Sequence, residues 1–418
     1  MLSLFELLAS LLVLTAVFGW VNHRFLRLPA NIGMLVMGLG ASLLLVGVEL
    51  AFPRTPLYAA LTGAVGQIDF YEAVMHGMLG FLLFAGALHV DLADLRQRAA
   101  TIGILASAGV VLSMFVVAAG LWTIGGFLGL PLPFAWCVVF GALIAPTDPV
   151  AVLSTLRQVA VPRSLRTDMT GEALFNDGVG VVLFTVAVAA AVQEGEGFGA
   201  VAIGRLLLFE AGGGALLGLA AGYLAFLAMR AIDDYAVETL ISIALVTGTY
   251  ALATRLHMSG PIAVVVAGVL MGNRGADRGM SDQTRRYVFG FWTLVDEILN
   301  AVLFLLIGLE VLVLAFAPEL AWVGLASIPL VLFARFLAVM VPVTVLSRRQ
   351  HFTPGTVPVL TWGGIRGGIS IALALSLPEG EGPARAAILH ATYAVVLFTV
   401  IVQGLSFAWV ARRAVVAR

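Results

Sequence analysis

Apolar runs of about 20 residues follow one another along almost the whole chain, with short polar segments between them. A helix of this length crosses a bilayer, and 61% hydrophobic against 11% charged residues lies far outside the composition of water-soluble domains. Because a segment in lipid must satisfy its own backbone hydrogen bonds, runs of this kind are helices. The sequence therefore predicts an all-α integral membrane protein.

The spacing of the apolar runs predicts about thirteen transmembrane helices. They begin near Leu2, Asn31, Phe70, Thr101, Phe134, Thr170, Ile203, Val237, Gly260, Val288, Leu320, Thr356 and Ala386. The first run lacks the small-residue pattern of a cleaved signal peptide, so we expect it to remain as a helix. Little sequence is left for loops, and we expect residues 1–418 to form a single transmembrane domain.

The basic residues predict the orientation of the helices. All 23 Lys and Arg residues are arginines, and 17 of them lie in odd-numbered loops or at the C-terminus. The positive-inside rule then puts these segments in the cytoplasm and the N-terminus outside. Arginine without lysine is typical of a GC-rich bacterial genome, which suggests a bacterial inner membrane. No basic patch indicates nucleic-acid binding, and the single Cys137 excludes an intrachain disulfide.

Two of the expected spans are interrupted. In the fifth span, Pro146 and Pro149 flank Thr147-Asp148, and a residue before proline is pushed from the helical region toward an extended conformation. In the twelfth span, Gly363-Gly364-Ile365-Arg366-Gly367-Gly368 places four glycines around a single arginine. Since glycine weakens a helix and lets backbones approach closely, we expect Arg366, Gly364 and Gly367 to mark a second unwound segment.

The interruptions predict an inverted repeat. If spans 1–6, at about residues 1–193, recur as spans 8–13, at about residues 236–411, the two breaks occupy equivalent positions. Span 7, at about residues 200–230, then links the halves, and the odd offset inverts the second copy. Crossing broken helices in inverted halves are typical of secondary transporters, whose site lies where the breaks meet.

Charged residues at membrane depth identify candidate functional groups, because a charge there is costly. The sixth span contains Glu172, Asn176 and Asp177, with Glu172 and Asn176 on one face and Asp177 about 100° further round. Arg335 is alone in the apolar eleventh span and is the obvious partner for Glu172, because buried charges are stabilised in pairs. Asp177 then remains as the acid without an assigned counter-ion.

A carboxyl group in this position can hold either a proton or a metal ion. Burial favours its neutral form, whereas a bound cation favours its ionised form. Hard monovalent cations prefer oxygen ligands, which Asp177, Asp148, Thr147 and the carbonyl groups of the break can supply. Competition of H+ and a cation for one site, with alternating exposure of that site to the two sides, is sufficient for obligatory exchange.

These motifs together resemble the monovalent cation/proton antiporters of the prokaryotic NhaP type, which are related to the Na+/H+ exchangers of animals. The residues that carry the resemblance are Thr147-Asp148-Pro149, Glu172, Asn176-Asp177, Phe291-Trp292, Asp296, Asn300, Ile307-Gly308-Leu309-Glu310, Arg335 and Gly364-Ile365-Arg366-Gly367-Gly368. The resemblance implies thirteen helices, a homodimer, ion or proton binding at Asp177 with Asp148, Thr147 and Asn176 nearby, and a Glu172–Arg335 pair.

The Asn176-Asp177 pair is similar to the electroneutral branch of these antiporters, which implies one cation per proton. Na+ or Li+ is the expected cation. Ala85 and Ala173 stand where many relatives have glutamate and serine, so K+/H+ or mixed exchange remains an alternative. An ion channel fits less well, because inverted broken helices and a titratable carboxylate at the membrane midplane favour alternating access. An intramembrane aspartyl protease fits less well, because the glycines follow Asp177 instead of preceding it. No phosphate-binding loop or ATPase domain is visible, so we expect ion gradients to drive transport without a cofactor.

Overall fold

The computed structural model describes residues 3–52, 63, 66–67, 69–148, 161–192, 204–205, 208–311, 318–378 and 382–416. These residues form helices and no strands. Ten helical stretches among them are long and apolar enough to cross a membrane. The prediction of an all-α, multi-pass membrane protein is confirmed, whereas the total of thirteen spans remains a prediction.

The helices follow the predicted order, and every expected span coincides with at least one helix. The first half contains α1 (Leu4–Val21), α2 (Ala30–Ala51), α4 (Phe70–Glu72), α5 (Leu79–Leu88), α6 (Leu92–Gln97), α7 (Ala99–Ile104), α8 (Val110–Phe127), α9 (Phe134–Ile144) and α11 (Arg163–Val192). Helix α13 (Gly213–Arg230) belongs to the linking seventh span. The second half contains α14 (Tyr235–Arg255), α15 (Gly260–Leu270), α16 (Ala276–Arg278), α17 (Asp282–Glu310), α18 (Pro318–Leu346), α19 (Thr356–Trp362), α20 (Gly368–Leu375), α21 (Gly382–Phe398) and α22 (Gly404–Val416). Short π-helical turns extend several of them, including η1 (Asn22–Leu26), η2 (Ala73–Met78), η3 (Leu105–Gly109), η4 (Leu208–Gly212), η5 (Met271–Gly275) and η7 (Thr399–Gln403).

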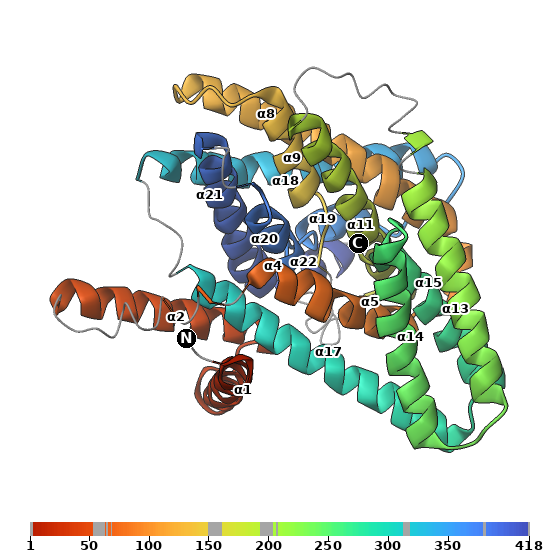
Figure 1. Cartoon of the computed structure of the whole chain (residues 1–418). Coiled ribbons are helices and arrows are strands. Elements are labelled where there is room, and N and C mark those ends of the chain that lie inside the picture. The colour runs from red at the N-terminus through yellow and green to blue at the C-terminus, as the bar shows by residue number, and fades with distance from the viewer. Residues whose placement is uncertain are drawn as a thin grey trace.

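Helix packing repeats between the two halves of the chain. The third and ninth spans pack together as α5 against α15, and the tenth and second spans pack together as α17 against α2. The fourth and eleventh spans, which are equivalent in the predicted repeat, also contact each other, as α8 against α18. In Figure 1, α17 runs diagonally beneath the centre of the molecule, and α13, α14 and α15 lie at its right-hand side. These three contacts agree with a seven-span offset, which remains a prediction.

Small residues allow close contact between α13 and α15. Gly214, Gly218 and Gly222 follow small-xxx-small spacing, which predicts tight packing. A methyl group added at Gly218 would lie 2.2 Å from the carbonyl oxygen of Ala263 on α15. A methyl group added at Gly214 would lie 2.6 Å from the carbonyl oxygen of Ser259. The packing role predicted for these glycines is confirmed.

Both predicted interruptions are present near the centre of the molecule. Helix α9 ends at Ile144, and Pro146, Thr147 and Asp148 are not helical. Residues 364–367 separate α19 from α20. Pro149 lies outside the described residues. In Figure 1, α11, α19 and α20 lie near the middle of the molecule, and α9 lies above them.

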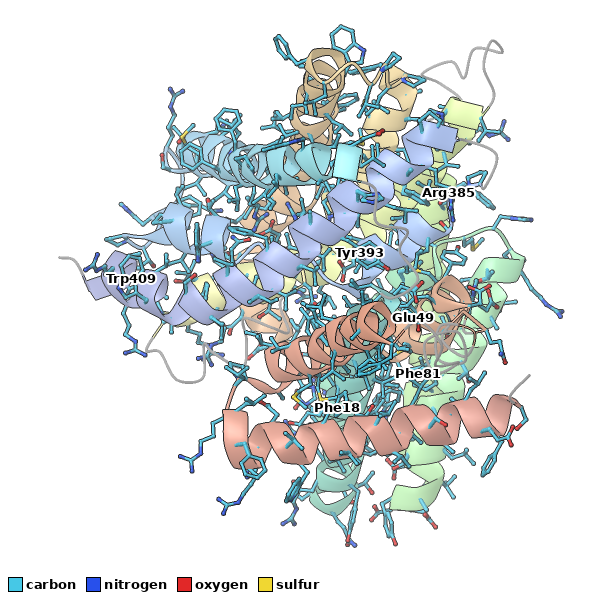
Figure 2. All side chains as sticks on the ribbon, turned by 90° about the vertical axis from the view of Figure 1, so that its left-hand side faces the viewer. Phe18, Glu49, Phe81, Arg385, Tyr393 and Trp409 are labelled. Atoms are coloured by element: carbon cyan, nitrogen blue, oxygen red, sulfur yellow. The ribbon has the colours of Figure 1, made fainter. Side chains whose placement is uncertain are left out.

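Helix α1 lies along one edge of the molecule and presents most of its side chains outward. Phe5, Val13 and Trp20 are each more than half exposed. Figure 2 shows α1 with Phe18 turned toward α2, and Phe18 is partly buried against the core. In the same view Arg385 and Trp409 mark the two ends of the continuous α21–α22 segment. Aromatic and basic side chains at the ends of a span are typical of membrane interfaces.

Candidate ion-binding site at the crossing of two broken helices

The two unwound segments bond directly to each other. The backbone N–H of Asp148 donates to the carbonyl oxygen of Ile365 at 2.8 Å. The guanidinium of Arg366 donates through one nitrogen to the carbonyl oxygens of Ala145 at 2.6 Å and Pro146 at 2.9 Å. Carbonyl groups at the end of α9 have no partner within their own helix, so Arg366 satisfies them from the other break. Backbone groups of residues 145–148 thus bond to the Ile365 carbonyl group and to the Arg366 side chain, which holds the two breaks together.

Glycine at position 367 lets the second break approach the first. A methyl group there would lie 2.5 Å from Oδ2 of Asp148 and 2.7 Å from its Cβ. Atoms cannot approach this closely, so any larger residue would displace the Asp148 side chain. The glycine-rich motif thus lets the second break lie close to Asp148, as its composition predicts.

Asp148 and Asp177 line one cavity of about 480 Å3 beside the crossing. Asp177 comes from the middle of α11 and is only 7% exposed, whereas Asp148 follows α9 and is half-buried. The two carboxylates thus face the same space. Two acids facing one cavity, deep in apolar helices, can share a proton or bind a cation between them.

Asn176 and Thr147 bond to each other beside the cavity. The Asn176 side-chain amide donates to the Thr147 hydroxyl at 2.8 Å. The Thr147 backbone N–H donates to the side-chain oxygen Oδ1 of Asn176 at 3.4 Å. Both residues are buried, and neither is among the residues that line the cavity. In this geometry Asn176 braces the unwound segment that carries Asp148.

Glu172 and Arg335 form a buried ion pair one turn along α11 from Asn176. The two terminal guanidinium nitrogens of Arg335 donate to the two carboxylate oxygens of Glu172, Nη1 to Oε1 and Nη2 to Oε2, the latter at 2.9 Å. Arg335 also donates to the carbonyl oxygen of Leu360 near the end of α19. A methyl group at Gly364 would lie 2.5 Å from Nε of Arg335. The pair therefore links α11, α18 and the broken twelfth span.

Polar side chains from α17 continue the cavity away from Asp177. Asp296, Glu297 and Asn300 all line it, and Asn300 donates to the Asp296 carboxylate at 2.9 Å. Asp296 and Asn300 therefore both line the cavity and bond to each other, whereas Glu297 is exposed. Ser370, on α20, adds a hydroxyl to the lining that our reading of the sequence missed. The only indication in the sequence was that Ser370 lies two residues after Gly368, the last glycine of the break.

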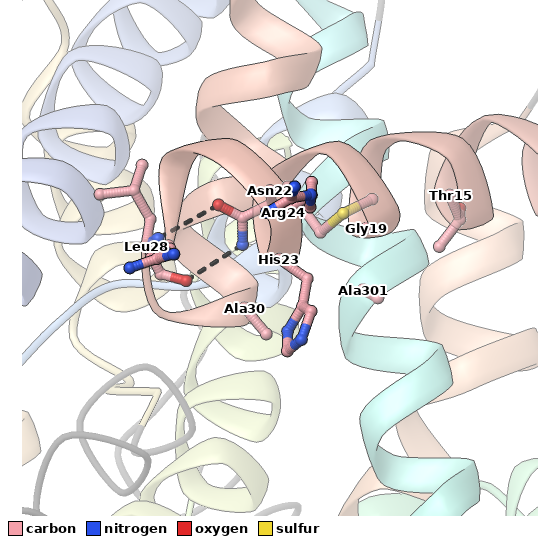
Figure 3. Close-up of a pocket in the computed structure, with 10 residues that line it drawn as sticks. Thr15, Gly19, Asn22, His23, Arg24, Leu28, Ala30 and Ala301 are labelled. Carbon is pink, nitrogen blue, oxygen red and sulfur yellow. Dashed lines mark hydrogen bonds between the residues drawn. The ribbon is translucent and has the colours of Figure 1, made fainter.

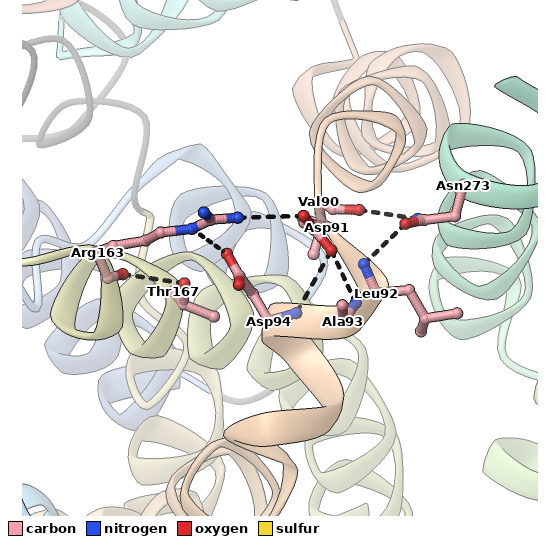
Figure 4. Close-up of polar contacts among 8 residues, drawn as sticks. All are labelled: Val90, Asp91, Leu92, Ala93, Asp94, Arg163, Thr167 and Asn273. Atoms are coloured by element: carbon pink, nitrogen blue, oxygen red, sulfur yellow. Dashed lines mark hydrogen bonds and ion pairs between the residues drawn. The ribbon is translucent and has the colours of Figure 1, made fainter. Parts of the chain in front are cut away.

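A hydrogen-bonded network supports the end of α5 that borders the cavity (Figure 4). Asn273 donates to the carbonyl oxygen of Val90 at 2.9 Å and accepts from the backbone N–H of Leu92 at 2.8 Å. Arg163, at the start of α11, pairs with Asp94 at 2.6 Å and with Asp91 at 3.2 Å. Val90 lines the cavity, so the network positions part of its wall. None of these contacts follows from sequence spacing.

A second buried ion pair was also missed. Asp168 is 1% exposed and accepts from the Arg98 guanidinium at 2.8 Å. This hydrogen bond raises the pKa of Arg98 above its ordinary value. Asp168 lies four residues before Glu172, on the same face of α11. The repeated acidic spacing was the available signal.

The described residues contain no cluster of three His, Cys, Asp or Glu side chains suited to a resident metal ion. Cys137, the single cysteine, is buried in α9.

Comparison with known proteins adds independent information. The family described as "Sodium/hydrogen exchanger, transmembrane" matches residues 12–413. The Na(+)/H(+) antiporter NhaP of Pseudomonas aeruginosa is 46% identical over 98% of this chain and 96% of its own length. The Na(+)/H(+) antiporter NhaH of Halobacillus dabanensis is 37% identical over 87% of this chain and 89% of its own length.

The fold is similar to that of the sodium proton antiporter MjNhaP1 from Methanocaldococcus jannaschii. The TM-score is 0.75 over 99% of both chains, at 18% sequence identity. The match of the family to nearly all of the chain agrees with the resemblance carried by the two breaks and the buried acids. The chain belongs to the sodium/hydrogen exchanger family.

Proposed function

We propose that this protein exchanges Na+ for H+ across the membrane, with the Asp177 carboxyl group occupied by the two ions in turn. The observation that carries the proposal is the position of Asp177, which lines a cavity at the crossing of the two broken helices. Two relatives covering most of the chain, NhaP and NhaH, are Na(+)/H(+) antiporters. A secondary transporter of this kind is not an enzyme.

The chemistry follows from competition for oxygen atoms. When the cavity faces a compartment rich in cation, Na+ binds the Asp177 carboxylate and displaces its proton. When it faces the other side, a proton neutralises the carboxylate and the cation leaves. Asp148 supplies a second carboxylate in the same cavity, and Thr147 and Asn176 hold the segment that carries it.

The shape of the cavity supports an open path to one side. Its lining includes two exposed residues, His89 just after α5 and Glu297 near the middle of α17. His89 lies next to the odd-numbered loop that contains Arg96 and Arg98, which the positive-inside rule assigns to the cytoplasm. We infer that Asp177 is accessible from the cytoplasm in this conformation, and that a second conformation opens it outward.

The remaining assignments belong to the same proposal. We expect a bacterial inner-membrane location, with the N-terminus outside and the C-terminus in the cytoplasm. Residues 1–418 would act as one exchanger domain, with repeats at 1–193 and 236–411 joined by the span at 200–230. We also expect a homodimer, no cofactor, and exchange of one cation per proton that does not respond to membrane voltage.

A proton-flux assay in liposomes tests the exchange. Purified protein is reconstituted with a pH-sensitive dye and an imposed pH gradient, and Na+, Li+ or K+ is added in turn. We expect Na+ and Li+ to dissipate the gradient, with a rate unchanged when valinomycin and K+ clamp the voltage. Dissipation by K+ instead would favour the alternative K+/H+ exchange. Cation flux without proton movement would contradict exchange and indicate a channel.

Gly367→Ala tests the close approach at the crossing. Because the added methyl group would displace the Asp148 carboxylate, we expect the exchange rate to fall by about tenfold or more. The matched control is Gly40→Ala, since nothing lies within 4 Å of a methyl group at that position. Equal rates in the two variants would show that Asp148 does not need its present position.

A further inference from the structure

A second cavity, of about 650 Å3, lies where α1 turns into α2 and has no part in the proposed exchange. Its lining includes His23, Arg24 and Arg27 and contains no aspartate or glutamate. The three basic residues are exposed, and within the described residues neither arginine forms an ion pair. The cavity is therefore electropositive, and it attracts anions.

A fixed backbone frames this cavity (Figure 3). The side chain of Asn22 donates to the carbonyl oxygen of Leu28 at 3.0 Å and accepts from its backbone N–H at 3.2 Å. Arg27 adopts a left-handed conformation, with φ 55°, and its backbone N–H donates to the carbonyl oxygen of Asn22 at 2.6 Å. The turn thus presents its arginines from a defined position.

The backbone of α2 adds to the positive potential. Ala30, its first residue, lines the cavity, and no side chain caps this end of the helix. The free N–H groups and the dipole at a helix N-terminus favour a negatively charged group. Oxygens of a phosphate group would complement both these N–H groups and the guanidinium groups.

The surroundings of the cavity are apolar on the membrane side. Trp20 is 62% exposed and Phe25 is 66% exposed, on either side of Asn22. Thr15 and Gly19 of α1 and Ala301 of α17 form the wall that leads into the hydrocarbon region. A bound molecule would therefore meet positive charge at one end and apolar surface at the other.

We propose that this cavity binds the phosphate headgroup of an anionic phospholipid from the cytoplasmic leaflet, with the acyl chains lying along α1 and α17. The positive-inside rule assigns this turn to the cytoplasm, where juxtamembrane arginines attract anionic lipid. Ala30 also lines the Asp177 cavity, so the headgroup sits beside the inferred cation entrance. The apolar wall favours a lipid over free phosphate.

Lipid retention in native mass spectrometry tests the proposal without measuring transport. Protein in detergent is titrated with phosphatidylglycerol, with phosphatidylcholine, or with inorganic phosphate. We expect selective retention of phosphatidylglycerol and a loss of affinity of roughly tenfold or more in Arg24→Gln/Arg27→Gln. The matched control is Arg348→Gln/Arg349→Gln, two exposed arginines of another cytoplasmic loop, which should leave retention unchanged.

A second variant keeps the charges and fills the space. Gly19 lines the cavity and has nothing within 4 Å of an added methyl group, so Gly19→Leu can fold and still exclude the lipid. Its control, Gly40→Leu, has the same freedom outside the cavity. Loss of retention in Gly19→Leu alone supports the site. Unchanged retention in both arginine and glycine variants, or equally strong binding of inorganic phosphate, would overturn it.

Discussion

We expect Asp177→Asn to abolish proton movement driven by Na+ in reconstituted liposomes, down to the level of protein-free vesicles. Asparagine has nearly the same shape as aspartate but cannot exchange a proton, so the cavity should keep its form and lose the group that we propose both ions occupy. The dye assay with an imposed pH gradient measures this rate directly.

The control for this variant is Asp282→Asn, which removes an exposed carboxylate from the first turn of α17, away from the cavity. It should exchange like the unmodified protein. The melting temperature of Asp177→Asn in detergent should be unchanged or higher, because an uncharged amide replaces a buried acid. Exchange at a normal rate by Asp177→Asn would refute the role proposed for this residue.

Arg335→Ala has the largest expected effect on stability. It leaves the Glu172 carboxylate buried without its counter-ion and removes the donors to the Leu360 carbonyl oxygen. Breaking a buried pair by removing one partner costs about 3–5 kcal/mol. We expect a lower folded yield and a lower melting temperature, measured by size-exclusion chromatography and thermal unfolding in detergent.

Glu172→Ala/Arg335→Ala separates the pairing from the space that the side chains fill. Removing both charges eliminates the uncompensated carboxylate, so the double variant should be more stable than Arg335→Ala alone. Arg348→Ala, at an exposed position, should have little effect. Strictly additive losses in the double variant would argue that the two side chains contribute independently.

The sequence was most informative where a residue conflicts with its surroundings. Prolines and glycines inside apolar runs predicted both breaks, because they remove helical hydrogen bonds wherever they occur. Arg335 was predictable as a paired residue since an isolated charge in an apolar span is costly, and the structure brings it to Glu172. The family predicted from these motifs is confirmed by the match to residues 12–413.

Contacts that depend on how helices rotate and dock could not be predicted. Helical periodicity puts Glu172 and Asn176 on one face, but it does not say that Asn176 meets Thr147 while Asp177 meets the cavity. The Arg98–Asp168 pair likewise depends on how α7 lies against α11. The open side of the cavity is a property of one conformation, about which spacing along the chain carries no information.

The bonds from Arg366 to Ala145 and Pro146 have a consequence for biogenesis. The carbonyl groups of the first break receive these donors from a residue 221 and 220 positions further along the chain. A ribosome that has delivered the first six spans to the insertion machinery has therefore not yet made the residue that completes them. The N-terminal half should consequently stay conformationally immature and sensitive to added protease until translation passes the twelfth span.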